Sequence, residues 1–214
     1  MEKQKVKTPK RSKKIKSLVS ALTTSALDTI KTSGIVKRYK RLKGKTNNSF
    51  EPDQAEVILL VGTENGSTAR FASAVFDQLL EAGVSVYIND MNKYESYLSA
   101  KHLLVFCSTY GDGEAPKTAT RFKKRLKETA QPNDIQFSVV GFGASFYKKY
   151  CAYAIKTQKR LSKQPWATSI VPLHTVNKRS ADEFAVWAQA WSDASGYSLS
   201  TNPDIYQKYT SKKK

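Results

Sequence analysis

Short apolar runs alternate with stretches of helical periodicity along most of this chain. The apolar runs predict strands near 57–62, 84–88, 103–108, 136–142 and 168–174, and the helical periodicity predicts helices near 68–82, 117–129, 147–162 and 180–194. Gly83 and the pair Pro132-Asn133 follow two of these helices and act as stop signals. Five strands alternating with helices predict an α/β fold with a doubly wound, five-stranded parallel sheet.

A turn of small polar residues follows the first predicted strand. It reads Thr63-Glu64-Asn65-Gly66-Ser67-Thr68 and leads directly into a helical pattern. Free backbone N–H groups at a helix start, together with the helix dipole, favour an anion such as phosphate. The same residue types also cap helices with nothing bound, so this turn alone does not decide between the two roles.

Two further strands end in glycine-containing loops, each with a tyrosine. They read Ser108-Thr109-Tyr110-Gly111-Asp112-Gly113-Glu114-Ala115-Pro116 and Gly141-Phe142-Gly143-Ala144-Ser145-Phe146-Tyr147. In an open parallel sheet, ligands bind beyond the carboxyl ends of the strands. We therefore expect the three loops to line one crevice, with a phosphate at the first loop and aromatic faces at the other two.

These three motifs, with Tyr150-Cys151 and the late segment Phe184-Ala185-Val186-Trp187, resemble a known family. The family is the flavodoxin-like FMN-binding domain of diflavin reductases and of the sulfite reductase flavoprotein. The resemblance spans about residues 55 to 196 and implies the strand order 2-1-3-4-5 and FMN as the cofactor. In that order the switch point lies between the first and third strands, beside the loops at Thr63 and Tyr110.

The resemblance also implies roles for individual residues. The first loop would wrap the FMN phosphate, Tyr110 would stack on one face of the isoalloxazine ring, and Tyr147 would lie on or near the other face. The implied cofactor-binding residues are Thr63, Glu64, Asn65, Gly66, Ser67, Thr68, Ser108, Thr109, Tyr110, Gly111, Phe142, Gly143, Ala144, Tyr147, Tyr150 and Cys151.

Two departures from the family pattern concern the cofactor and the partner. Ala144 stands where such reductases usually carry an asparagine, so we expect backbone groups to replace a side-chain hydrogen bond there. Where the family tends to carry an acidic cluster, this chain reads Thr175-Val176-Asn177-Lys178-Arg179. With Lys148 and Lys149, this segment favours an electron acceptor with an acidic surface.

Charge divides the chain of 214 residues into three parts. Residues 1–50 carry 15 Lys and Arg against Glu2 and Asp28, whereas residues 51–204 carry 17 against 16 and residues 205–214 add four lysines. We expect a basic, partly helical or disordered extension over 1–54, one domain over 55–200, and a basic tail over 201–214. The composition, 40% hydrophobic and 11% aromatic, is ordinary for a globular domain.

The basic extension has two interpretations. Apolar residues from Ile15 to Ile30 recur at helical spacing between basic clusters, so residues 10–43 suit a peripheral contact with a membrane. A solvated extension fits the same pattern. No run reaches the length of a spanning helix and no signal peptide is evident, which predicts a cytoplasmic protein, peripheral at the inner membrane face in the first interpretation.

The remaining candidates for chemistry are few. Cys107 and Cys151 lack metal-ligand spacing and suit buried free thiols in a reducing compartment, and His102 and His174 form no triad or zinc pattern. We therefore expect no catalytic residues and no metal. The tryptophans Trp187 and Trp191, four residues apart, are expected in the core.

Two functions from different classes follow. The first is an FMN electron-transfer protein that receives electrons from a separate FAD- and NADPH-containing reductase and passes them to a haem or iron–sulfur centre. A separate reductase is expected because no nicotinamide-binding region follows the domain in this sequence. The second is a flavodoxin-like module without flavin that binds nucleic acid or an acidic partner through its basic segments, with nucleic acid the less favoured partner.

Overall fold

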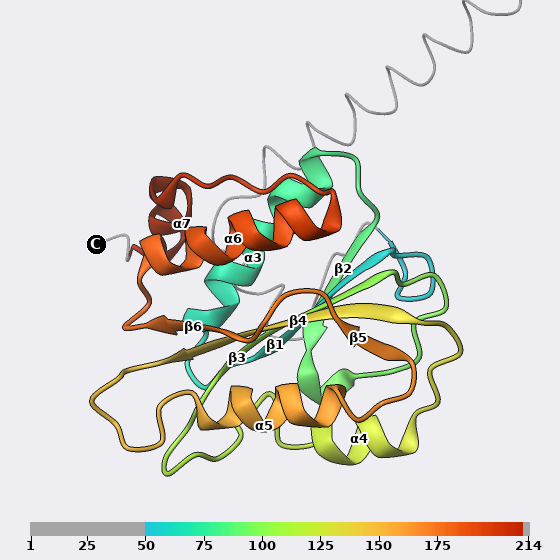
Figure 1. Ribbon diagram of the computed structural model, residues 1–214, viewed down its shortest axis with the longest axis horizontal. Helices are drawn as coiled ribbons and strands as arrows, with labels where there is room; N and C mark the ends of the chain where they lie inside the picture. Colours follow the sequence, from blue (N-terminus) through green and yellow to red (C-terminus); the bar gives the residue numbers. More distant parts are fainter. Residues whose placement is uncertain (1–49, 212–214) are drawn as a thin grey trace, which may run out of the picture. The chain divides into compact units, whose positions relative to one another are not determined.

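The computed structural model describes residues 50–211, which form an α/β domain (Figure 1). The strands are β1 (Val57–Gly62), β2 (Val86–Asp90), β3 (His102–Ser108), β4 (Ile135–Gly143), β5 (Ala167–Ser169) and β6 (His174–Asn177). The helices are α3 (Ser67–Glu81), α4 (Phe122–Glu128), α5 (Ala152–Leu161), α6 (Ala181–Ser195) and α7 (Pro203–Thr210), with a 3₁₀ turn η1 (Met91–Lys93).

The strands pair in parallel in the order β2-β1-β3-β4-β5, and β6 also pairs with β4. This confirms the predicted doubly wound sheet and its order. The central strands are buried on both faces, because helices cover both sides of the sheet. Their apolar runs, without polar alternation, are the sequence signature of that burial.

The fifth predicted strand, 168–174, is wrong in one respect: it is two short strands, β5 and β6, separated by residues 170–173. The interruption contains Pro172, which has no N–H to donate to a neighbouring strand. Both strands still pair with β4, at its beginning and its end respectively. The second strand also begins later than predicted, at Val86.

Helices α4 and α5 begin about five residues later than their periodicity predicts. Residues 117–121 and 147–151 are turns instead, and Cys151 takes a left-handed conformation with φ of 48° immediately before α5. A non-glycine residue at positive φ does not continue a right-handed helix. Residues 117–121 and 147–151 therefore belong to loops at the carboxyl edge of the sheet and not to the helices.

Helix α7 was not predicted, although the residues that start it are visible in the sequence. Asn202 caps it by accepting a hydrogen bond from the N–H of Asp204, and Pro203 occupies its first turn. Its residue Tyr206 is buried and lies 4.7 Å, centroid to centroid, from Phe184. Part of the segment expected to be a basic tail therefore packs on the domain.

Two hydrophobic clusters hold the helices against the sheet. Helices α3, α6 and α7 pack on one face of the sheet, above it in Figure 1, and helices α4 and α5 pack on the other. Trp187 and Trp191 lie in the first cluster, fully buried, as expected. Cys107 and Cys151 lie in the second as buried free thiols, and burial raises the pKa of the Cys151 thiol to about 11.

Residues 1–49 of the basic extension, including the predicted helical pattern over residues 15–30, lie outside the described residues. Among residues 50–211, no helix combines the length and the apolar character that a membrane span requires.

Candidate functional site

The ends of β1, β3 and β4 bring the three predicted loops to one edge of the sheet. Gly62 pairs in register with Cys107, and Cys107 pairs with Gly141, so the three strands end at nearly the same level. The hydroxyl of Ser108 donates to the carbonyl of Gly62 at 3.3 Å and ties the second loop to the first. In Figure 1 these loops lie at the left-hand end of the sheet.

The first loop has a backbone shape that leaves the start of α3 open. Gly66 takes a left-handed conformation, φ 87°, and donates its N–H to the Thr63 hydroxyl oxygen at 2.9 Å. The N–H of Ser67 is bonded to the Asn65 side-chain oxygen at 3.2 Å. Gly66 itself has no side chain to cap α3, whereas α6 and α7 are capped by side chains.

Thr68 adds a second observation at the same helix start. It is 1% exposed, and its hydroxyl is buried without a hydrogen-bond partner in the described structure. A buried hydroxyl without a partner is unfavourable, and satisfying it would recover that cost. An anion bound at the start of α3 would supply acceptor oxygens both for this hydroxyl and for N–H groups of the first turn that have no partner within the helix.

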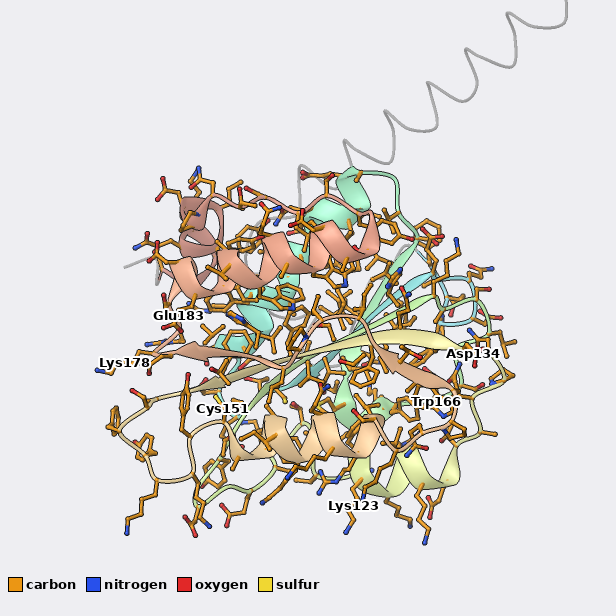
Figure 2. All side chains as sticks on the ribbon, viewed as in Figure 1. Lys123, Asp134, Cys151, Trp166, Lys178 and Glu183 are labelled. Atoms are coloured by element: carbon orange, nitrogen blue, oxygen red, sulfur yellow. The ribbon has the colours of Figure 1, made fainter. Side chains whose placement is uncertain are left out.

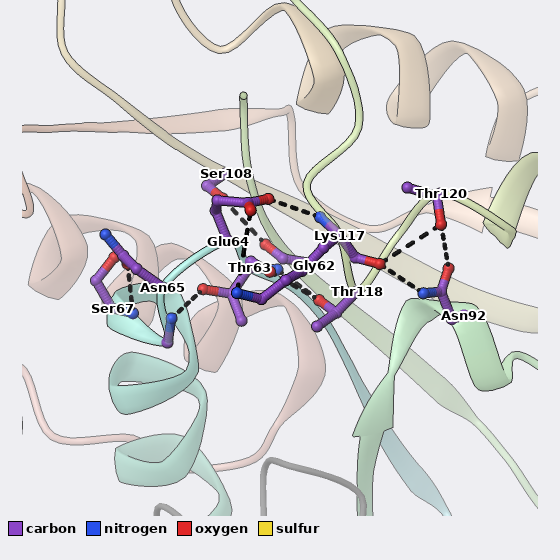
Figure 3. A network of polar contacts seen from close by, with 11 residues as sticks. Gly62, Thr63, Glu64, Asn65, Ser67, Asn92, Ser108, Lys117, Thr118 and Thr120 are labelled. Carbon is purple, nitrogen blue, oxygen red and sulfur yellow. Dashed lines mark hydrogen bonds and ion pairs between the residues drawn. The ribbon is translucent and has the colours of Figure 1, made fainter. Parts of the chain in front are cut away.

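Glu64 and Thr63 connect the first loop to Lys117 and Thr118 (Figure 3). The Glu64 carboxylate accepts a hydrogen bond of 2.8 Å from the backbone N–H of Lys117 and lies 4.0 Å from its ammonium group. The Thr118 hydroxyl accepts from the Thr63 N–H at 2.7 Å. Lys117 and Thr118 were not recognised from the sequence, because they are more than 50 residues from the loop and join it only in the fold.

The second loop is a tight turn that leaves the Tyr110 side chain 54% exposed. Tyr110 and Glu114 exchange two backbone hydrogen bonds, of 3.1 and 2.8 Å, and Gly111 and Gly113 take positive φ between them. The Thr109 hydroxyl accepts from the N–H of Tyr153 at 3.1 Å. These hydrogen bonds fix the backbone of the loop, and the phenol ring of Tyr110 remains accessible to a ligand.

The third loop approaches the second and is partly buried. Lys149 lies 3.5 Å from the carboxylate of Asp112 and connects the two loops. Any Cβ at Gly143 would lie 3.0 Å from the Tyr150 ring and 3.1 Å from the Cys151 sulfur, so these two side chains pack directly on the Gly143 backbone. Phe142, in contrast, is buried in the core, which leaves only its backbone for a ligand.

An asparagine does reach the third loop, from β6 rather than from position 144. The Asn177 side-chain oxygen accepts from the N–H of Ser145 at 2.9 Å, and the N–H of Lys178 donates to the Gly143 carbonyl at 2.8 Å. Ala144 contributes its carbonyl, which accepts from the N–H of Tyr147. The sequence offered no signal for Asn177, since it is 32 residues from its partner.

Two exposed aromatic rings stand at the tip of this loop. Tyr147 is 62% exposed and Phe146 is 68% exposed, and their centroids are 4.3 Å apart. The Lys178 ammonium lies 5.8 Å from the centre of the Phe146 ring. Because large apolar side chains are normally covered, adjacent exposed rings at a sheet's carboxyl edge indicate a binding surface.

The flavodoxin family model matches residues 59–191, a stretch that contains all three loops and the strands before them. This chain belongs to the flavodoxin family.

Curated relatives agree with that assignment. The sulfite reductase [NADPH] flavoprotein alpha-component of Bacillus subtilis is 31% identical over 110 residues, which is 50% of this chain and 18% of the relative. The NADPH-dependent diflavin oxidoreductase 1 of Schizosaccharomyces pombe is 29% identical over 113 residues, 50% of this chain and 19% of the relative. The match thus spans about a fifth of these relatives' length.

Solved structures support the fold. Oxidised Flavodoxin 2 from Bacillus cereus has a TM-score of 0.55 at 19% identity, covering 67% of this chain and 100% of that one. Oxidised Flavodoxin 1 from the same species has a TM-score of 0.52 at 15% identity, covering 72% and 99%.

Proteins of this family bind FMN, and the residues at the carboxyl edge suit both parts of that molecule. The open start of α3 and the unsatisfied Thr68 hydroxyl suit its phosphate, and the exposed Tyr110 and Tyr147 suit its flat ring system. The residues present therefore fit the family's cofactor.

Asp90 gives this edge a pH-dependent contribution to stability. It ends β2, in register with Val61, and burial raises the pKa of its carboxyl from 3.8 to about 6, an effect that Lys93 partly offsets. The pKa of Asp90 is higher in the folded protein than in the unfolded chain, so folding disfavours the ionised carboxylate. The contribution of Asp90 to the free energy of unfolding therefore falls as pH rises from about 4 to 6.

We expect Asp90→Asn to stabilise the protein by about 1–2 kcal/mol at pH 8, with a smaller gain at pH 4.5. Urea unfolding of both proteins at the two pH values measures this difference. The exposed Asp134→Asn variant is the matched control and should change stability little. A gain from Asp90→Asn that is equal at both pH values would contradict the assignment.

Proposed function

We propose that this chain binds FMN at the carboxyl edge of its sheet and carries electrons. The observation that carries the proposal is the convergence of an open helix start with a buried, unsatisfied Thr68 hydroxyl and two loops that present exposed tyrosine rings. Membership of the flavodoxin family supports it independently.

Each loop has a task in this proposal. The first turn of α3 binds the phosphate with its N–H groups and the hydroxyls of Ser67 and Thr68, and Gly66 allows the backbone to approach. Tyr110 and Tyr147 stack on the ring and exclude water from its faces. Backbone groups from Gly143 to Cys151 line the ring edge. Glu64 acts indirectly, since its carboxylate is engaged with Lys117 and would repel a phosphate.

When bound, FMN supplies the redox chemistry, because it accepts two electrons together and can release them one at a time. The chain's residues adjust the potential through stacking, hydrogen bonds and local charge. The exposed loop tip keeps the ring edge within reach of a partner.

The donor and the acceptor belong to the same proposal. An NADPH-dependent flavoprotein reductase supplies the electrons, since the two relatives described above carry NADPH in their names. The acceptor is a haem or iron–sulfur protein with an acidic docking surface, because Lys148, Lys178 and Arg179 are exposed at the loop tips. Electron delivery to it should slow as ionic strength rises.

The first experiment is an absorption spectrum of the full chain purified without added flavin, followed by titration of the colourless fraction with FMN. We expect flavin bands, or quenching of flavin fluorescence at micromolar or lower concentrations. Riboflavin lacks the phosphate and is the matched control ligand, expected to bind at least about tenfold more weakly if charge-assisted bonds hold the phosphate.

Failure of a folded sample to bind FMN at micromolar concentration would overturn the proposal and leave the flavin-free binding module. Equal affinities for FMN and riboflavin would remove the phosphate role of the first loop while keeping a flavin site.

A further inference from the structure

The face of the domain formed by α4 and α5 is strongly basic. Nine basic residues lie on these two helices or immediately beside them, against one carboxylate, Glu128. This basic face consists of Arg121, Lys123, Lys124, Arg125, Lys127, Lys156, Lys159, Arg160 and Lys163. The helices on the opposite side of the sheet, α3, α6 and α7, carry six carboxylates and two basic residues. The near-neutral domain therefore has two sides of opposite charge.

Few of these cations are neutralised within the domain. In the part of the chain that the structure describes, Lys124 and Glu128 form the one ion pair on the basic face, at 3.9 Å, between side chains that are mostly exposed. Lys156 donates to the carbonyl of Gly113 and Arg125 to the carbonyl of Tyr94. The remaining lysines of the face are exposed and carry no ion pair in residues 50–211.

Helix stability accounts for only part of this pattern. Basic groups in the last turn of a helix interact favourably with its dipole, which applies to Arg125 and Lys127 on α4 and to Lys159 and Arg160 on α5. Lys123 and Lys127 are four apart on α4, and Lys156, Lys159 and Lys163 recur at spacings of three and four on α5 and the residues after it. Like charges at these spacings destabilise a helix. An anionic surface brought against the face would remove that repulsion.

Lys156 reaches the second loop through its bond to Gly113, but the basic face also extends away from the carboxyl edge of the sheet. Figure 2 places Lys123 on the outer side of α4, away from Cys151 and Lys178 at the carboxyl edge. At that edge the charges are mixed, because Asp112 and Glu64 pair with lysines there. A redox partner has to approach the carboxyl edge of the sheet. The basic face of α4 and α5 therefore suits a second partner that leaves this edge accessible.

We propose that the basic face binds the anionic surface of a phospholipid membrane. The face is rich in lysine, whose compact charge suits many phosphate arrangements. Its aromatic residues, Phe122 and Tyr153, are buried and offer no platform for stacking nucleic-acid bases. It also contains a hollow of about 490 Å³ lined by Arg121, Lys124, Arg125, Glu128 and Thr129, where a phosphate headgroup can be surrounded by cations.

This binding mode has a consequence for orientation. Since α4 and α5 pack on one face of the sheet, a membrane against them lies parallel to the sheet. The carboxyl edge then points along the membrane surface rather than into it. Electron partners on the same membrane would reach Tyr110 and Tyr147 without displacing the domain. The lipid contact itself does not depend on FMN.

The test compares two variants of the full chain with equal loss of charge. One carries Lys123→Gln, Lys127→Gln, Lys159→Gln and Lys163→Gln on the basic face. The matched control carries Lys93→Gln, Lys101→Gln, Arg179→Gln and Lys208→Gln, which lie elsewhere on the domain. Binding to phosphatidylcholine vesicles with and without phosphatidylserine is measured by co-sedimentation at physiological salt, and circular dichroism checks the fold of each variant.

We expect the basic-face variant to lose at least about tenfold in affinity for the phosphatidylserine vesicles, and the control to change by less than about twofold. Acetylation of the wild type should show vesicles protecting Lys123, Lys127, Lys159 and Lys163. This readout separates the face from the N-terminal segment, which is also rich in Lys and Arg.

Four outcomes would overturn the proposal. Equal losses in the two variants would mean that total charge governs binding, and no loss in either variant would mean that the N-terminal segment does. Absence of protection at the four lysines would show that the face stays in solvent. Tighter binding of duplex DNA than of vesicles, lost in the basic-face variant, would assign the face to nucleic acid.

Discussion

Replacing Tyr110 or Tyr147 with alanine is expected to weaken FMN binding by about 10- to 100-fold, the range that loss of one aromatic stacking partner produces. Both side chains are more than half exposed, so their removal opens no cavity in the core. Stability without ligand should therefore change by less than about 0.5 kcal/mol. Fluorescence titration of each variant with FMN, beside its urea unfolding curve, measures the two effects separately.

Phenylalanine at the same positions keeps the ring and is the conservative comparison. Tyr110→Phe and Tyr147→Phe should retain FMN affinity within about threefold, because stacking needs the ring and not the hydroxyl. Phe146→Ala is a control for the third loop, since that ring is equally exposed and adjacent. If Phe146→Ala loses affinity and Tyr147→Ala does not, the stacking role belongs to Phe146.

Trp187→Ala is expected to destabilise the domain by about 3–5 kcal/mol, the usual cost of truncating a buried tryptophan. The side chain is 1% exposed and packs against Phe106 and Phe184, with ring centroids 5.2 and 5.1 Å away. Its indole N–H donates to the buried Ser138 hydroxyl at 2.9 Å, so truncation also leaves that hydroxyl without its donor. This loss is a large fraction of the stability of a typical domain.

Urea unfolding followed by far-ultraviolet circular dichroism measures this effect without relying on tryptophan fluorescence. Val186→Ala, one residue away on α6 and 62% exposed, is the matched control and should cost less than about 0.5 kcal/mol. Trp187→Phe should fall between the two, since it keeps much of the volume but loses the hydrogen bond. A cost of Trp187→Ala no greater than that of Val186→Ala would contradict the packing described for α6.

The predicted fold depended on signals that are local in the sequence. The uninterrupted apolar runs at 57–62 and 103–108 predict central strands, because a strand covered on both faces needs no polar alternation. Glycines and small polar residues after each run predict loops rather than continued strands. These local patterns also identified the three loops that the structure brings to one edge.

Contacts between residues far apart in the chain leave no local signal in the sequence. Thr118 and Asn177 have ordinary surroundings in the sequence, and only the fold places them against Thr63 and Ser145. Helices α4 and α5 begin later than predicted for the same reason. Periodicity continues through 117–121 and 147–151, but there Lys117 and Thr118 bond to the first loop and Lys149 pairs with Asp112 of the second.

The sequence by itself determined the α/β class, the order of its main elements, the three loops and the basic N-terminal segment. Each of these depends on residues adjacent in the chain, where the side-chain period and the backbone preferences act directly. Only the tertiary structure decided that the nearly equal charges of residues 51–204 separate into a basic α4–α5 side and an acidic side formed by α3, α6 and α7. A sheet covered on both faces divides successive helices between its two sides, so the sum of charges along the chain cannot show which surface each charge reaches.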